Sequence, residues 1–185
     1  MSHAAAATPV QLWATFTAKA QALGTTVLHA ESEAHLAQLL SEAGQVAVTA
    51  SAARRYASLA SGFESAADGP SVEVAAAAEF AVAETGSLVL DEPRADRGAC
   101  FLADRLWLLV PLDALVATID EAFLRLADLI RAGAKHPLLM SGPSRTADIE
   151  RVLTVGVHGP CSLVAVIVDS AGPRPPSGAL DSSIR

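Results

Sequence analysis

Cysteine, basic residues and long apolar runs are all scarce in this chain, and each scarcity excludes a class of protein. The two cysteines, Cys100 and Cys161, lie far apart and outside any C-x-x-C spacing, which argues against an iron-sulfur cluster or structural zinc site built by this chain alone. We interpret both as small buried thiols in a reducing compartment. Because 13 Lys and Arg stand against 20 Asp and Glu, nucleic acids and anionic membranes are not predicted partners.

No membrane span is predicted, although 51% of the residues are hydrophobic. Apolar runs such as Leu106–Leu112 fall far short of the roughly 18 to 20 residues that a spanning helix needs. The N-terminal segment has no basic residue ahead of its apolar part, so we expect no secretory signal and a cytoplasmic protein. With 185 residues, 18% of them charged, the chain is long enough for one domain with a full core.

Helical and strand patterns alternate along the chain. Apolar spacing predicts helices over 10–23, 31–44 and 51–59, and strands at 25–30 and 45–50. The second half is less regular, with apolar runs at 80–83 and 87–90, a strand at 105–111, a helix to about 132 capped by Asp113, a strand at 136–142, a helix from Ser144 to about Val155 and a strand at 162–169.

This alternation predicts an α/β fold, an open Rossmann-like and mostly parallel sheet with helices on both faces. We expect one domain over residues 1–169. Residues 170–185 are rich in Pro, Gly and Ser, which predicts a flexible C-terminal tail.

Three polar clusters occupy places where ligands bind in such folds, beyond the carboxyl ends of strands. They are AETGS at 83–87, SGPSRTADIE at 141–150 and GVHGP at 156–160. The second has two interpretations. The Gly- and Ser-rich turn and the N-terminus of the predicted helix are suited to hold a phosphate or carboxylate, with Arg145 and Thr146 as further donors. Alternatively, Ser144 is only a helix cap and Arg145 pairs with Asp148.

Glu84 and His158 are the candidate proton-handling residues. Glu84 lies between two apolar runs, where a carboxylate is either paired or functionally perturbed, unless it is an exposed acid at a hairpin turn. Gly86 permits a turn closed to other residues. His158 is suited to act as acid, base or oxyanion donor, or else is structural. No metal site is predicted, because no second His or carboxylate stands at ligand spacing around His158.

Several common motifs are absent from the sequence. It has no G-x-x-x-x-G-K-[ST], no G-x-G-x-x-G after a strand and no G-x-S-x-G. Nucleoside triphosphatase, dinucleotide-binding and α/β-hydrolase functions therefore lose their usual support.

Taken together, AETGSLVL at 83–90, SGPSRTADIE at 141–150 and GVHGP at 156–160 resemble the lactate-utilisation (LUD) domain family, lactate-utilisation protein C type. The resemblance covers roughly residues 80–169. It implies a fold similar to sugar-phosphate isomerases and CoA-transferases, and a part in oxidising L-lactate to pyruvate beside iron-sulfur partner proteins. Because this chain has no cysteine motif for such a cluster, the resemblance implies a cluster-free component of a multi-protein system, with no cofactor in this chain and iron-sulfur clusters only in its partners. Ser87 stands where the family commonly has Thr.

The leading hypothesis is a lactate-utilisation subunit whose three loops bind a small anion. Its proposed proton-handling residues are Glu84 and His158. Its proposed ligand-binding residues are Thr85, Gly86, Ser87, Ser141, Gly142, Ser144, Arg145, Thr146, Asp148, Glu150 and Gly159. Two alternatives stay open, a stand-alone isomerase or acyl-transfer enzyme that uses Glu84 as base or nucleophile, and a non-catalytic assembly protein.

Overall fold

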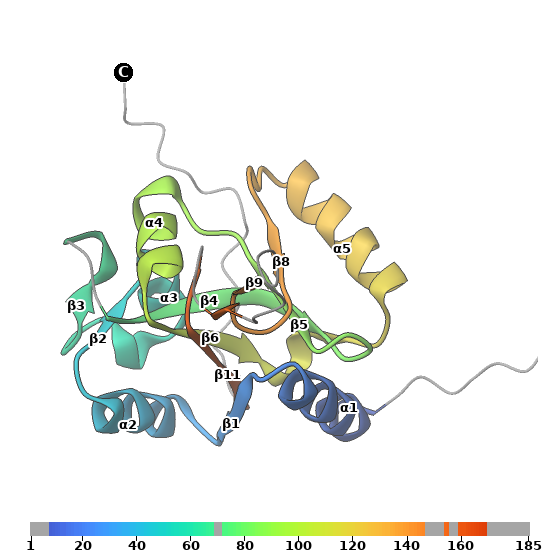
Figure 1. The fold of residues 1–185 in the computed structure, drawn as a ribbon, viewed down its shortest axis with the longest axis horizontal. Helices are drawn as coiled ribbons and strands as arrows, with labels where there is room; N and C mark the ends of the chain where they lie inside the picture. The colour runs from blue at the N-terminus through green and yellow to red at the C-terminus, as the bar shows by residue number, and fades with distance from the viewer. Residues whose placement is uncertain (1–7, 69–71, 147–153, 156–158, 170–185) are drawn as a thin grey trace, which may run out of the picture.

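The computed structural model describes residues 8–68, 72–146, 154–155 and 159–169, and for 9, 68, 145–146 and 154–155 it describes the backbone alone. The helices are α1 (Pro9–Ala22), α2 (Glu33–Ala43), α3 (Ala50–Arg55), α4 (Arg94–Leu102) and α5 (Ile119–Arg131), with 3-10 helices at Ala57–Leu59, Ala66–Asp68 and Leu112–Ala114 (Figure 1). The strands are β1 (Thr26–Ala30), β2 (Val46–Val48), β3 (Glu64–Ser65), β4 (Glu73–Val82), β5 (Ser87–Leu90), β6 (Arg105–Pro111), β7 (Leu115–Val116), β8 (Leu138–Met140), β9 (Arg145–Thr146), β10 (Thr154–Val155) and β11 (Ser162–Val168).

Most of the described strands belong to one sheet with the order β1-β11-β6-β4-β2-β3, and every neighbouring pair on this path is parallel. The long strand β4 lies beside β6 in its first half. Its second half pairs with β5 in the antiparallel sense and with β7 in the parallel sense. β8 then pairs antiparallel with β5. The predicted α/β class with a mostly parallel sheet is confirmed.

Side chains of the central strands alternate between the two faces of this sheet, so each face carries an apolar core. Helices cover both faces. On one face, Leu108 belongs to a core that includes Phe16 of α1 and Cys100 of α4. On the other face, Leu109 belongs to a core that includes Leu36 of α2 and residues of α3. The predicted helices at 10–23 and 31–44, and the strands at 105–111 and 162–169, agree with the structure within about two residues.

The predicted role of Asp113 as the cap of the long helix is wrong. Asp113 lies in a 3-10 helix, and the apolar pair Leu115–Val116 then forms β7 beside β4. The helix begins only at Ile119, where the Thr118 side chain accepts a hydrogen bond from Glu121 N at 3.3 Å. Because Leu115 and Val116 pair with β4, α5 begins later than predicted, and Thr118 is its N-cap.

The predicted helix from Ser144 to about Val155 is wrong at both ends. Arg145 and Thr146 form β9, which pairs antiparallel with Thr154 and Val155 of β10. Three of these four residues are β-branched, which favours extended backbone over helix. The segment 147–153 between them lies outside the described residues. Helix α4, at Arg94–Leu102, is an element that the sequence patterns did not indicate.

The two cysteines differ in environment. Cys100 is buried, as predicted, and burial raises the pKa of its thiol. Cys161 is exposed, so the prediction of a second buried thiol is wrong. It lies directly before β11, whose buried residues begin only at Leu163.

Across the described part of the chain, no helix combines the length and apolar character that crossing a membrane requires. The domain prediction, residues 1–169, stays a prediction, and the predicted tail, 170–185, lies outside the described residues.

Candidate functional site

The first polar cluster, 83–87, is the turn that joins β4 to β5. Gly86 N donates to Val82 O at 2.9 Å, which closes the turn. Gly86 has φ of +68°, and a Cβ placed there would lie 2.4 Å from the backbone nitrogen of Ala20 in α1. Only glycine combines this backbone conformation with so close an approach to a neighbouring helix. The predicted special role of Gly86 in the turn therefore agrees with the structure.

Three hydroxyl groups meet beside this turn, and we call Thr85, Ser87 and Ser141 the hydroxyl cluster. Thr85 Oγ1 donates to Ser87 Oγ at 2.8 Å, and Ser87 Oγ lies 2.6 Å from Ser141 Oγ. Antiparallel pairing of β5 with β8 brings these residues together, although Ser87 and Ser141 are 54 positions apart in sequence. Ser87 is fully buried, whereas Ser141 is exposed. The buried hydroxyl therefore links two loops that reach the surface.

The second and third predicted clusters also lie side by side. Ser144 N donates to Pro160 O at 3.0 Å. A Cβ at Gly159 would lie 3.2 Å from the Cβ of Ser144. Gly142, with φ of +85°, presses against the end of α1, where a Cβ would approach Leu23 O to 2.8 Å. The structure thus brings 83–87, 141–144 and 159–160 into one continuous group of loops.

Ser144 does not cap a helix in this arrangement, because β9 follows it directly. The predicted helix N-terminus is therefore not available to hold an anion at this place. Of Arg145 and Thr146 only the backbone is described, and Asp148, Glu150 and His158 lie outside the described residues.

Glu84 is an exposed acid at the hairpin turn, the second of its two interpretations. Its Oε2 accepts a hydrogen bond from Ile119 N, the first residue of α5, at 2.8 Å. Its own N–H donates to Ala117 O at 3.0 Å. A carboxylate at a helix N-terminus satisfies an otherwise unpaired N–H group and stabilises the helix dipole. Glu84 therefore connects the first predicted loop to the start of α5, with its carboxylate accessible to solvent.

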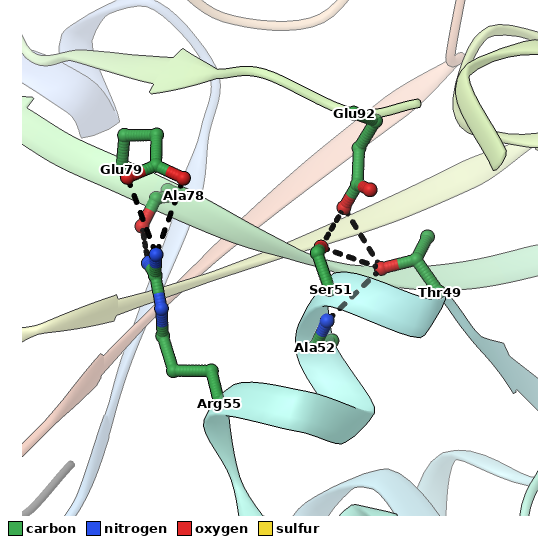
Figure 2. A network of polar contacts seen from close by, with 7 residues as sticks. All are labelled: Thr49, Ser51, Ala52, Arg55, Ala78, Glu79 and Glu92. Atoms are coloured by element: carbon green, nitrogen blue, oxygen red, sulfur yellow. Dashed lines mark hydrogen bonds and ion pairs between the residues drawn. The ribbon is translucent and has the colours of Figure 1, made fainter. Parts of the chain in front are cut away.

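A second polar group, which the sequence patterns did not indicate, lies at the carboxyl end of β2, and Figure 2 shows it in close-up. We call Thr49, Ser51 and Glu92 the carboxyl cluster. Glu92, only 4% exposed, accepts hydrogen bonds at Oε1 from Thr49 Oγ1 at 2.8 Å and from Ser51 Oγ. The hydroxyls of Thr49 and Ser51 lie 3.1 Å apart. Two hydroxyl groups thus converge on one oxygen of a buried carboxyl.

Burial raises the pKa of Glu92 to about 7, and the nearby charge of Asp96 adds to this effect. The hydrogen bonds from Ser51 and Thr49 oppose it by stabilising the ionised form. Glu92 Oε2 is buried and has no hydrogen-bond partner within the part of the chain that the structure describes. Glu92 therefore exchanges its proton near neutral pH. An acid two positions after the apolar run SLVL was the available sequence signal.

The neighbouring Arg55 is held by β4, as Figure 2 also shows. Its guanidinium donates to Ala78 O and, at 3.2 Å, to both carboxylate oxygens of Glu79. The side chains of Arg55 and Glu79 are only 9% and 15% exposed. The β4–β5 register shifts between Ala78 and Phe80, so Arg55 stabilises β4 where its pairing is irregular.

The fold and the loops define an α/β domain whose polar segments gather around the β4–β5 and β8 connections. The LUD domain family model matches residues 76–168. The chain belongs to the LUD domain family. This match contains most of β4, all of β5 and β8, and the three residues of the hydroxyl cluster.

Curated relatives match over about half of the chain. It is 34% identical over 95 residues to "Lactate utilization protein C 1" of Bacillus mycoides, a match that covers 49% of this chain and 41% of the relative. It is 40% identical over 92 residues to "Lactate utilization protein C" of Deinococcus radiodurans, covering 48% of this chain and 42% of the relative. The matched part thus spans about two fifths of the length of these relatives.

A solved structure, the crystal structure of a DUF162 family protein from Deinococcus radiodurans, has a similar fold. It superimposes with a TM-score of 0.63, covering 88% of this chain and 99% of the other, at 22% identity. At this identity the likeness concerns the fold alone. The expected similarity to sugar-phosphate isomerases and CoA-transferases stays a prediction.

Proposed function

We propose that this chain is a component of an L-lactate utilisation system in the cytoplasm and acts beside iron-sulfur partner proteins. Membership of the LUD family and the names of the relatives support this proposal. Oxidation of L-lactate to pyruvate releases two electrons and two protons, so the system needs an electron acceptor. Cys100 and Cys161 stand in no cysteine motif for a cluster, so we assign electron transfer to the partner proteins.

The proposed site is a small-anion pocket formed by 83–87, 141–146 and 156–160. The observation that carries it is the 2.6 Å contact between Ser87 and Ser141, which fixes two of these loops to each other. Loops held on a rigid sheet are frequent binding sites. The sheet fixes their position, while many of their N–H and O–H groups make no hydrogen bonds within helices or sheets. Ser141 is an exposed residue, and its hydroxyl lies 2.6 Å from that of the buried Ser87.

Within this pocket we assign roles to the other candidate residues. Arg145 supplies the positive charge for a carboxylate or phosphate. Glu84 and His158 transfer protons. The exposed position of Glu84 at the end of the hairpin supports its part, since a proton-handling group must reach a bound ligand.

A thermal-shift screen tests the pocket. L-lactate, other 2-hydroxy acids, sugar phosphates and CoA esters are added at millimolar concentration to the wild-type chain and to Ser141→Ala. We expect at least one of these anions to raise the Tm of the wild type and to have a smaller effect on the variant. Ser41→Ala, an exposed serine on α2, is the control and should respond like the wild type. If no anion stabilises the wild type, the pocket proposal fails.

A genetic experiment tests the pathway independently of the pocket. The gene is deleted from its host, and growth is measured with L-lactate or with glucose as carbon source. The proposal predicts a defect on L-lactate alone, restored by the wild-type gene, and cysteine-rich reading frames beside the gene. Normal growth of the deletion strain on L-lactate would contradict the pathway assignment even if the pocket bound an anion.

A further inference from the structure

Helix α5 carries more apolar surface than the core covers. Ala122 and Leu129 are buried in the core, and Leu126 packs against it. Yet Phe123, Leu124 and Ile130, on the same helix, are 61%, 70% and 57% exposed. Such large side chains in water are unfavourable when they gather on one surface, and a gathered set marks an interaction site.

The three exposed residues and the half-buried Ala127 form one continuous face. With about 100° per residue, Phe123, Leu124, Ala127 and Ile130 occupy an arc directly beside the buried residues. We call these four residues the outer face of α5. Buried and exposed apolar positions together span roughly 220° of the helix, about twice the stripe that a surface helix needs to dock on its own core. Figure 1 shows α5 at the margin of the fold, on the side away from α2 and α3.

Charges at the two ends of this face complement each other. Asp120 in the first turn and Arg131 in the last turn lie on the same helical row as Leu124 and Ala127. If a second α5 packs antiparallel, with Phe123 beside Ile130 of the other copy, Arg131 comes within about two residues, or roughly 3 Å along the axis, of the other Asp120. Both ends of the pair then match, and the small Ala127 at the centre lets the helices approach closely.

We propose that the outer face of α5 is a homodimer interface in which two copies of this chain pack their α5 helices antiparallel about a two-fold axis. A two-fold interface must be complementary to itself, which an acid at one end and a base at the other provide. One helix pair buries less area than a standard stable interface, so the dimer is weak and forms as concentration rises.

The experiment is sedimentation velocity of the full chain over a concentration series. The wild type should change from 19.0 kDa to twice this mass. Leu124→Glu should weaken dimerisation at least about tenfold, because it buries a charge in an apolar contact. Leu102→Glu, a change of equal character at a residue 76% exposed on α4, should have no effect. A wild type that stays monomeric to about 1 mM overturns the proposal, as does a dimer that Leu124→Glu leaves intact.

A charge exchange tests the antiparallel arrangement without altering the apolar face. Asp120→Lys and Arg131→Glu should each weaken the dimer by about threefold or more, since like charges then face each other twice. The double variant should return to within about twofold of the wild type. Asp128→Ala is the control for Arg131→Glu, because Asp128 forms an ion pair with Arg131 on its own helix. A double variant no better than the singles would overturn the arrangement, and circular dichroism verifies that each variant is folded.

Discussion

Both polar clusters of this domain contain Ser and Thr hydroxyl groups, but one reaches the surface and the other surrounds a buried carboxyl group. In the hydroxyl cluster, Ser87 is buried but joins Thr85 and the exposed Ser141, so its hydrogen bonds lead to the surface. In the carboxyl cluster, Thr49 and Ser51 converge on Glu92, which is itself buried. The first cluster positions surface loops without placing a charge in the interior. The second contains an ionisable group whose charge is costly where it lies.

The largest effect is expected where the first loop meets α1. Gly86→Ala should lower the free energy of unfolding by at least about 3 kcal/mol, because it combines an unfavourable φ with a clash against backbone. Gly62→Ala is the matched control. Its φ is +90°, but a Cβ there meets nothing within 4 Å, so we expect a loss of only about 1 kcal/mol. Urea denaturation measures both, and equal losses would show that α1 does not constrain the turn.

The carboxyl cluster should make stability depend on pH. Folding raises the pKa of Glu92 from 4.5 to about 7, so between these values the folded chain binds a proton that the unfolded chain has lost. The free energy of unfolding therefore falls as pH rises from 4.5 to 7, by roughly 3 kcal/mol from this residue, and the loss persists at higher pH.

Glu92→Gln removes this titration while retaining the side-chain shape. The stability of the variant relative to the wild type should therefore increase by roughly 3 kcal/mol between pH 4.5 and pH 8. Denaturation curves at several pH values measure the difference, with Glu64→Gln, at an exposed residue of β3, as control. A difference independent of pH would mean that Glu92 titrates as it does in an unfolded chain.

A smaller effect is expected in the hydroxyl cluster. Ser87→Ala removes the link between Thr85 and Ser141, and should cost about 1 to 2 kcal/mol because it leaves polar groups without their partner. Its effect should not vary between pH 5 and pH 8, since a hydroxyl does not titrate there. A pH-dependent loss in this variant would remove the distinction between the two clusters.

The sequence predicted the elements whose apolar spacing is regular, such as β6 and the helices α1 and α2. It also indicated that three separated loops come together, and contacts at Ser87–Ser141 and Ser144–Pro160 join the described parts of these loops. The prediction of a helix after Ser144 was wrong because a capping pattern is local, whereas β9 and β10 pair across seven intervening residues. Glu92 was missed because a carboxylate after a strand is usually exposed, and its burial depends on the packing of α3 and α4.

We propose that the loops around the hydroxyl cluster, and not those around Glu92, bind a small anion. The most direct test is an amide NMR titration of the ¹⁵N-labelled chain with L-lactate, with pyruvate and inorganic phosphate in parallel. We expect saturable shifts at Thr85, Gly86, Ser87, Ser141 and Gly142. Shifts confined to Thr49, Ser51 and Glu92, or no saturable shift with any of the three anions, would contradict it.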